Sequence, residues 1–184
     1  MLPSPGMTNE ADRQLLLQLA RDALTARVSG NSQPVPLLAG VAARCGAAFV
    51  TLHAHGELRG CIGHLDASEP LGAVIGRCAV AAGTTDPRFP GVTPAELPHI
   101  HIEISLLGPL EPVASLEEVE IGRHGLVAEM GWHRGLLLPQ VATEWGWDRE
   151  KFAAETCRKA GLASDAWKNG ATLWKFTAEV FGES

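Results

Sequence analysis

The chain carries a cysteine between two glycines at the end of a strand-like run, in segment 58–63 with the sequence LRGCIG. Side chains alternate across a strand, so Arg59 and Cys61 are expected on one face, with Cα atoms about 6.5 Å apart. A guanidinium beside a cysteine favours the thiolate, which is the nucleophilic form. Gly60 and Gly63 would let a ligand or a backbone N–H group approach closely. The segment predicts a small electropositive site with a reactive thiol.

The same segment also has a purely structural interpretation. Free cysteine is among the most buried residue types, and glycine in a strand often marks a bulge or close packing. A catalytic interpretation needs a second group, and His124, which lies between Arg123 and Gly125, is the candidate base. A lone histidine is more often a hydrogen-bonded structural residue, so both roles stay open.

A proline-rich loop holds further candidates. Segment 84–91, TTDPRFPG, places Asp86 and Arg88 beside the aromatic Phe89. Its prolines exclude regular structure, and loops of this composition often line sites, although turn formation alone would also explain it. We expect Asp86 and Arg88 to position a small polar or anionic substrate, or a partner.

Histidines alternate with apolar residues in two predicted strands. His99, His101 and Glu103 share one face of segment 99–107, and His53 and His55 are similarly spaced. A metal site between neighbouring strands is one interpretation, but a solvated strand face gives the same alternation. The cysteines lack C-x-x-C spacing; they stand at positions 45, 61, 78 and 157. We expect no bound metal and no cofactor.

Composition limits the classes of function. The 184 residues carry a net charge of −6, and the basic residues are scattered, so nucleic-acid binding is disfavoured. The chain has no apolar run of 18 residues and no signal-peptide pattern at its start, so no membrane span and a cytoplasmic location are expected. Residues 1–7 are expected to form a flexible tail.

The predicted elements favour an α+β fold of two layers, in which helices cover a largely antiparallel sheet. We expect a helix from a cap at Thr8 to about residue 28, and a hairpin over residues 49–62. Further helices are predicted over 68–82, 140–145 and 149–160, a short helical turn over 115–118, and strands over 99–107, 121–127 and 172–181, with a second hairpin around Gly131 and Gly135.

Five ordered blocks carry a family resemblance: segments 58–63, 86–89, 102–105, 122–126 and 137–141. They closely resemble the AMMECR domain family, whose bacterial and archaeal members are called AmmeMemoRadiSam system protein A. The resemblance covers about residues 8–182 as a single domain and implies two closely joined sublobes. It also implies genomic company with a Memo-like protein and a radical SAM enzyme, which are the expected partners. Gln140, in the last block, joins Gly60, Gly63, Asp86 and Arg88 as a candidate substrate- or partner-binding residue.

Two functions follow from these patterns. The first is a cysteine-dependent enzyme acting on a small polar substrate, with Cys61 as nucleophile or thiol carrier, Arg59 stabilising it and His124 as base. The alternative is a non-catalytic module in which the glycine-rich segment and the 86–89 loop dock to the Memo-like or radical SAM partner. The sequence makes no prediction of oligomeric state.

Overall fold

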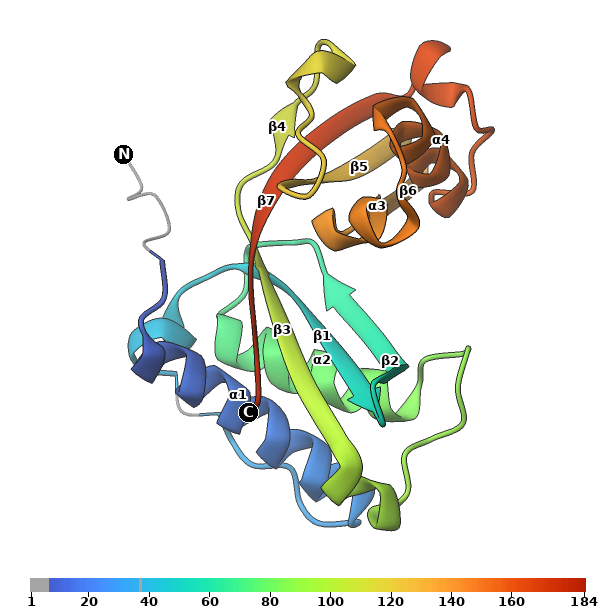
Figure 1. The fold of residues 1–184 in the computed structure, drawn as a ribbon. Helices are drawn as coiled ribbons and strands as arrows, with labels where there is room; N and C mark the ends of the chain where they lie inside the picture. The colour runs from blue at the N-terminus through green and yellow to red at the C-terminus, as the bar shows by residue number, and fades with distance from the viewer. Residues whose placement is uncertain (1–6, 37) are drawn as a thin grey trace. The chain divides into compact units, whose positions relative to one another are not determined.

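The computed structural model describes residues 7–36 and 38–184, and the chain forms two compact units (Figure 1). The first unit comprises Met1–Leu107 and Glu179–Ser184, and the second comprises Gly108–Ala178. Strand β7 (Thr172–Gly182) begins in the second unit and ends in the first. Apart from Met7, the predicted N-terminal tail lies outside the described residues.

The sheet of the first unit is built on the predicted hairpin. Strand β1 (Ala47–Ala54) pairs antiparallel with β2 (Glu57–His64) on one side and with β3 (Ile100–Leu107) on the other. The hairpin loop is His55 (φ 53°) and Gly56 (φ 81°). Two consecutive residues with positive φ form the turn that best matches the twist of the paired strands.

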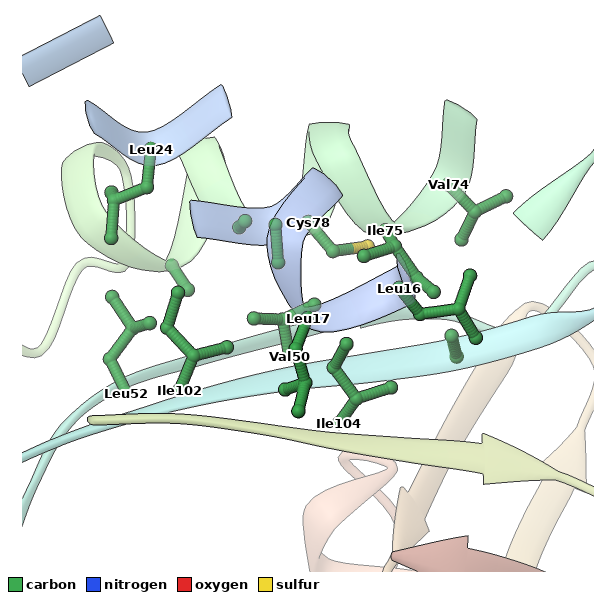
Figure 2. Packing of buried hydrophobic residues seen from close by; sticks show 14 of the residues in the cluster. Leu16, Leu17, Leu24, Val50, Leu52, Val74, Ile75, Cys78, Ile102 and Ile104 are labelled. Carbon is green, nitrogen blue, oxygen red and sulfur yellow. The ribbon is translucent and has the colours of Figure 1, made fainter. Parts of the chain in front are cut away.

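Helices cover one face of this sheet. Helix α1 (Glu10–Val28) and helix α2 (Leu71–Thr84) pack over alternate residues of β1 and β3, all fully buried (Figure 2). These buried strand residues are Val50, Leu52, Ile102 and Ile104. Because side chains alternate, the odd-numbered residues of both strands lie on the opposite face of the sheet.

The start of α1 differs from the prediction by one residue. Asn9 caps the helix by accepting a hydrogen bond from the Asp12 N–H group at 2.8 Å. The predicted cap, Thr8, bonds the carboxylate of Glu179 instead. Asn9 and Asp12 form a reciprocal capping box, which explains why the helix begins there.

The loop between α2 and β3 is irregular, as its prolines predict. It ends in the 3-10 helix η2 (Pro94–His99), which Thr93 and Glu96 cap reciprocally. A second short 3-10 helix, η1 (Gly40–Ala43), precedes β1. None of the helices in the described residues is long and apolar enough to cross a membrane.

The second unit has its own sheet and core. Strand β5 (His124–Met130) pairs antiparallel with β6 (His133–Leu137) and with β7, and the short β4 (Glu111–Pro112) also pairs with β7. Helices α3 (Pro139–Trp145) and α4 (Arg149–Lys159) and the 3-10 helices η3 (Leu116–Glu118) and η4 (Ala166–Lys168) complete it. The core contains the fully buried Val119, Leu126, Ala128, Phe152 and Cys157.

Strand β5 begins three residues later than predicted. The N–H groups of Arg123 and His124 both donate to the Glu120 carbonyl, which closes a turn over residues 120–124. Gly122 adopts φ 89° within this turn, a conformation that suits glycine and no strand. The prediction of a strand from Ile121 was therefore wrong at its start.

Candidate functional site

Cys61 lies half-buried in β2, and its sulfur contacts a hydroxyl group on the neighbouring strand. The Cys61 Sγ is 3.2 Å from Thr51 Oγ1, and Thr51 is 7% exposed. Thr51 stands opposite Cys61 on one side and opposite Glu103 on the other, so these residues form a row across β2, β1 and β3. The row lies on the face of the sheet opposite α1 and α2.

The backbone of Cys61 is held by a buried carboxylate from the 85–99 loop. Asp86 is 4% exposed, and its Oδ2 accepts hydrogen bonds from the Cys61 N–H at 3.0 Å and from Arg88 Nη2 at 2.8 Å. Its Oδ1 accepts from the Arg88 N–H and Nε, both at 3.1 Å. These bonds, chiefly the one from the Arg88 side chain, hold the pKa of Asp86 well below its usual range. Asp86 is therefore an anion throughout the neutral pH range.

Arg88 is close to Cys61 and remains half-exposed. Besides its two bonds to Asp86, its Nη2 lies 3.5 Å from the Cys61 carbonyl, and its guanidinium lies 5.4 Å from the centroid of the Phe89 ring. The hydrogen bond to Asp86 raises the pKa of Arg88; burial opposes this rise, and the charge of Cys61 adds to it. Arg88 therefore lies beside the backbone of Cys61 and keeps its charge.

The guanidinium of Arg59 is directed to a different partner from the one expected. Its Nε donates to Glu96 Oε1 at 3.0 Å, and its Nη1 donates to the Pro90 carbonyl at 2.8 Å. The β-bulge at Leu52/His53 shifts the register next to Arg59, which disturbs the simple alternation on which the prediction relied. Arg59 therefore connects β2 to the 85–99 loop through these hydrogen bonds, and the carboxylate of Glu96 neutralises the charge of Arg59.

The glycines of segment 58–63 allow close packing within the first unit, while their role in binding a ligand or partner stays a prediction. A Cβ at Gly60 would lie 2.1 Å from the Ala82 carbonyl oxygen of α2. A Cβ at Gly63 would lie 2.3 Å from the Phe49 ring. The backbone of α2 and the Phe49 ring therefore lie where a side chain at Gly60 or Gly63 would extend.

Two candidate residues belong to the second unit. His124 opens β5, and its Nδ1 accepts a hydrogen bond from the Glu120 N–H at 2.9 Å. Burial lowers the pKa of His124, and the charges of Lys175 and Arg123 lower it further. Gln140 lies half-buried in the first turn of α3. The role of His124 as a base toward Cys61 stays a prediction.

The bond to Glu120 makes the role of His124 testable. Replacing His124 with leucine leaves the Glu120 N–H without its acceptor, and we expect a loss of about 1 to 3 kcal/mol of unfolding free energy. Urea denaturation measures this loss. If His124 is the base toward Cys61, the folded variant should be alkylated at Cys61 more slowly at pH 7. An unchanged rate would count against that role.

The histidine-rich strand face does not gather a metal site within residues 7–36 and 38–184. No group of three or more histidine, cysteine, aspartate or glutamate side chains there could hold a metal ion. His55 and His99 lie near one another, with ring centroids 5.3 Å apart, while His101 Nε2 contacts the Glu183 carbonyl oxygen.

Sequence reasoning missed two residues of this site. Thr51 contacts the sulfur, and Glu96 binds Arg59. A two-residue hairpin loop predicts the register of the paired strands, but without the bulge Thr51 would stand opposite Gly60. Glu96 had a usable signal, since threonine followed three residues later by glutamate is the pattern of a capping box.

Comparison with known proteins gives the family. The AMMECR1 family profile matches residues 17–181. The chain belongs to the AMMECR1 family. The segments that carry Cys61, Asp86 and His124 all fall inside the matched region.

Relatives of this AMMECR1 chain cover most of its length. A protein of Methanothermobacter thermautotrophicus is 49% identical over 142 residues, which are 73% of this chain and 74% of the relative. A protein of Methanococcoides burtonii is 40% identical over 183 residues, covering 96% and 92% of the two chains. The crystal structure of the uncharacterized protein PH0010 from Pyrococcus horikoshii superposes with a TM-score of 0.91 at 36% identity, covering 96% and 93%.

Proposed function

We propose that this AMMECR1-family protein uses Cys61 as a thiol nucleophile or thiol carrier for a small anionic substrate. The observation that supports this most is the sulfur itself: half-buried, 3.2 Å from the Thr51 hydroxyl, on the sheet face opposite α1 and α2. A hydroxyl group that donates a hydrogen bond to sulfur favours the thiolate over the thiol. Thr51 can therefore stabilise the reactive form.

Asp86 and Arg88 give this thiol a fixed position and a nearby positive charge. The Asp86 carboxylate holds the Cys61 N–H, which limits movement of the residue. The half-exposed Arg88 presents a cation to solvent beside it and would attract an anionic substrate. In the reaction, the thiolate sulfur forms a bond to an electrophilic carbon, whose leaving group departs with its electron pair. The thiol proton passes to solvent.

Alkylation tests the proposal, because the other cysteines can be replaced or are buried and therefore react slowly. Cys45 is exposed and is replaced by serine, whereas Cys78 and Cys157 are buried, and burial raises the pKa of Cys78 to about 11. We expect iodoacetamide to modify Cys61 at pH 7 about tenfold faster than a model peptide thiol, which corresponds to about one pKa unit of thiolate stabilisation. Mass spectrometry locates the modification. A rate no faster than the peptide's would end the proposal.

The charge preference of the site gives a second measurement. Iodoacetate carries a negative charge and iodoacetamide carries none, so the ratio of their rates reports the attraction by Arg88. We expect Arg88→Gln to lower this ratio several-fold, and Arg77→Gln, which removes an arginine paired with Glu69, to leave it unchanged. Thr51→Val is expected to slow both reagents, since it removes the hydroxyl at the sulfur.

A docking module is the second candidate function, supported by the position of β2 and Arg88. Strand β2 is an edge of its sheet, and the half-exposed Arg88 beside it offers a charged contact. The family resemblance suggests a Memo-like protein or a radical SAM enzyme as the partner. Co-purification separates the two functions. Docking predicts that Arg88→Glu loses the partner while Cys61→Ser keeps it, and retention by a folded Arg88→Glu variant would count against docking.

A further inference from the structure

The first unit contains a cavity of about 500 Å³ between α1, α2 and the loop after α1. This volume is within the range of about 300 to 1,000 Å³ that is typical of small-molecule sites. Neither Cys61 nor the 85–99 loop lines it. Its apolar side chains come from both helices and from the proline-rich loop: Leu19, Ala23, Val80, Pro34, Val35 and Pro36.

Gly76 keeps this cavity open at a cost to the helix. Glycine in a helix interior is less favourable than alanine, so it calls for a reason. Gly72, one turn earlier, has one: an added Cβ would lie 3.1 Å from Leu38 and 3.2 Å from Ala42. A Cβ at Gly76 would meet only Ala23, at an ordinary 3.7 Å. Packing therefore explains Gly72 but not Gly76, whose missing side chain leaves the cavity wall bare.

Two charged side chains of the lining, Asp22 and Arg27, have no ion pair within the described residues, and of these two only Arg27 also lacks a hydrogen bond. Arg77 is paired with both carboxylate oxygens of Glu69, at 2.7 and 2.9 Å, and Asp22 accepts a hydrogen bond from Gln18 Nε2 at 2.7 Å. The side chain of Arg27, in the last turn of α1, makes no ion pair or hydrogen bond within residues 7–36 and 38–184. Arg27 lies five residues after Asp22, which places the two residues about 7.5 Å apart along the axis of α1.

We propose that this cavity binds an amphipathic carboxylate of the fatty-acid type. The apolar chain lies against Gly76 and the apolar lining, and the carboxylate pairs with Arg27, whose planar guanidinium suits a carboxylate. The charge of Arg27 is what favours a carboxylate over a neutral apolar molecule. This site is independent of the function proposed for Cys61.

Calorimetric titration of the full chain with dodecanoate and with dodecanol, both kept below the concentrations at which they aggregate, tests the head group. We expect dodecanoate to bind more tightly than dodecanol, and Arg27→Gln to weaken dodecanoate about tenfold while leaving dodecanol unchanged. Equal affinity of the wild-type protein for both compounds would overturn the assignment to a carboxylate. Failure of dodecanoate to bind at millimolar concentration would overturn the ligand class.

A pair of substitutions at Gly76 tests the location. Gly76→Leu fills the cavity, and we expect it to abolish binding, whereas Gly76→Ala should retain binding and raise the melting temperature. Val80→Trp fills the same cavity and replaces the leucine variant if that variant fails to fold. Undiminished dodecanoate binding by a folded cavity-filling variant would show that the site is elsewhere.

Discussion

Replacing Gly60 with alanine is expected to lower the unfolding free energy of the first unit more than any other glycine-to-alanine substitution there. The added Cβ would lie 2.1 Å from the Ala82 carbonyl oxygen and 3.0 Å from its carbonyl carbon. Both are backbone atoms of α2, so relief requires moving the helix away from β2. Inserting a methyl group into a well-packed interior costs about 1 to 3 kcal/mol, and a clash with backbone is expected to reach or exceed the upper end. Urea denaturation measures the loss.

Two other glycines provide graded controls for this result. The Cβ of Gly63→Ala would meet the Phe49 ring at 2.3 Å, and because a side chain can rotate, we expect a smaller loss than at Gly60. Gly76→Ala should raise stability by up to about 1 kcal/mol, since alanine is the better helix former. If Gly60→Ala were as stable as the wild-type protein, β2 and α2 would not approach each other this closely.

Replacing Asp86 with asparagine is expected to lower the unfolding free energy at pH 7. The variant should also lose less of this free energy than the wild-type protein when the pH is lowered. Asparagine keeps one acceptor for the Cys61 N–H but loses the charged bonds to Arg88, so we expect a loss of about 2 kcal/mol at pH 7. Since Arg88 is half-exposed, water solvates the cation that remains, and the loss should stay below that of a fully buried pair.

The pH dependence of this effect follows from the pKa shift. The folded state holds the pKa of Asp86 well below its unfolded value of about 3.9, so its stabilisation is complete only above about pH 5. It is lost as the pH falls from about 5 through the folded pKa, because the unfolded chain then binds the proton more readily. The wild-type protein should lose this stability in acid, and Asp86→Asn should not.

Glu96 is the matched control for the acid experiment. The Thr93 N–H and the Arg59 side chain lower the pKa of Glu96 to about 2, so it contributes to the same loss in acid. Glu96 is more exposed than Asp86. Glu96→Gln should therefore change the loss of unfolding free energy at low pH less than Asp86→Asn does. Chemical denaturation at several pH values compares both variants with the wild-type protein. Superimposable pH profiles of Asp86→Asn and the wild-type protein would contradict the buried, ionised carboxylate.

Local sequence signals were sufficient for much of the fold. The short connection His55-Gly56-Glu57 and the strand-like residues around it predicted the first hairpin, and Asp148 and Gly161 correctly marked the two ends of α4. Alternation predicted β3 and β7 within one residue at each end. These features depend on residues a few positions apart, so the sequence contains the information directly.

Long-range contacts explain why the surroundings of Arg59, Gly60 and Gly63 differ from those that local alternation predicts. Placing Arg59 beside the sulfur followed from ideal alternation, whereas a bulge in the hairpin and the carboxylate of Glu96, 37 residues away, direct its guanidinium elsewhere. Gly60 and Gly63 suggested an open site because a glycine does not reveal which atoms approach it. Only the packed structure places Ala82 and Phe49 there.

The sequence by itself determined the family blocks, the α+β class and the presence of Cys61, Asp86 and Arg88 as chemically capable residues. The tertiary structure alone decided that Thr51 contacts the sulfur, that Asp86 holds the Cys61 backbone and that Arg59 serves the loop. The physical reason is that strand pairing and loop closure are non-local. A shift of one residue in register changes which side chains meet, and no local pattern encodes that shift.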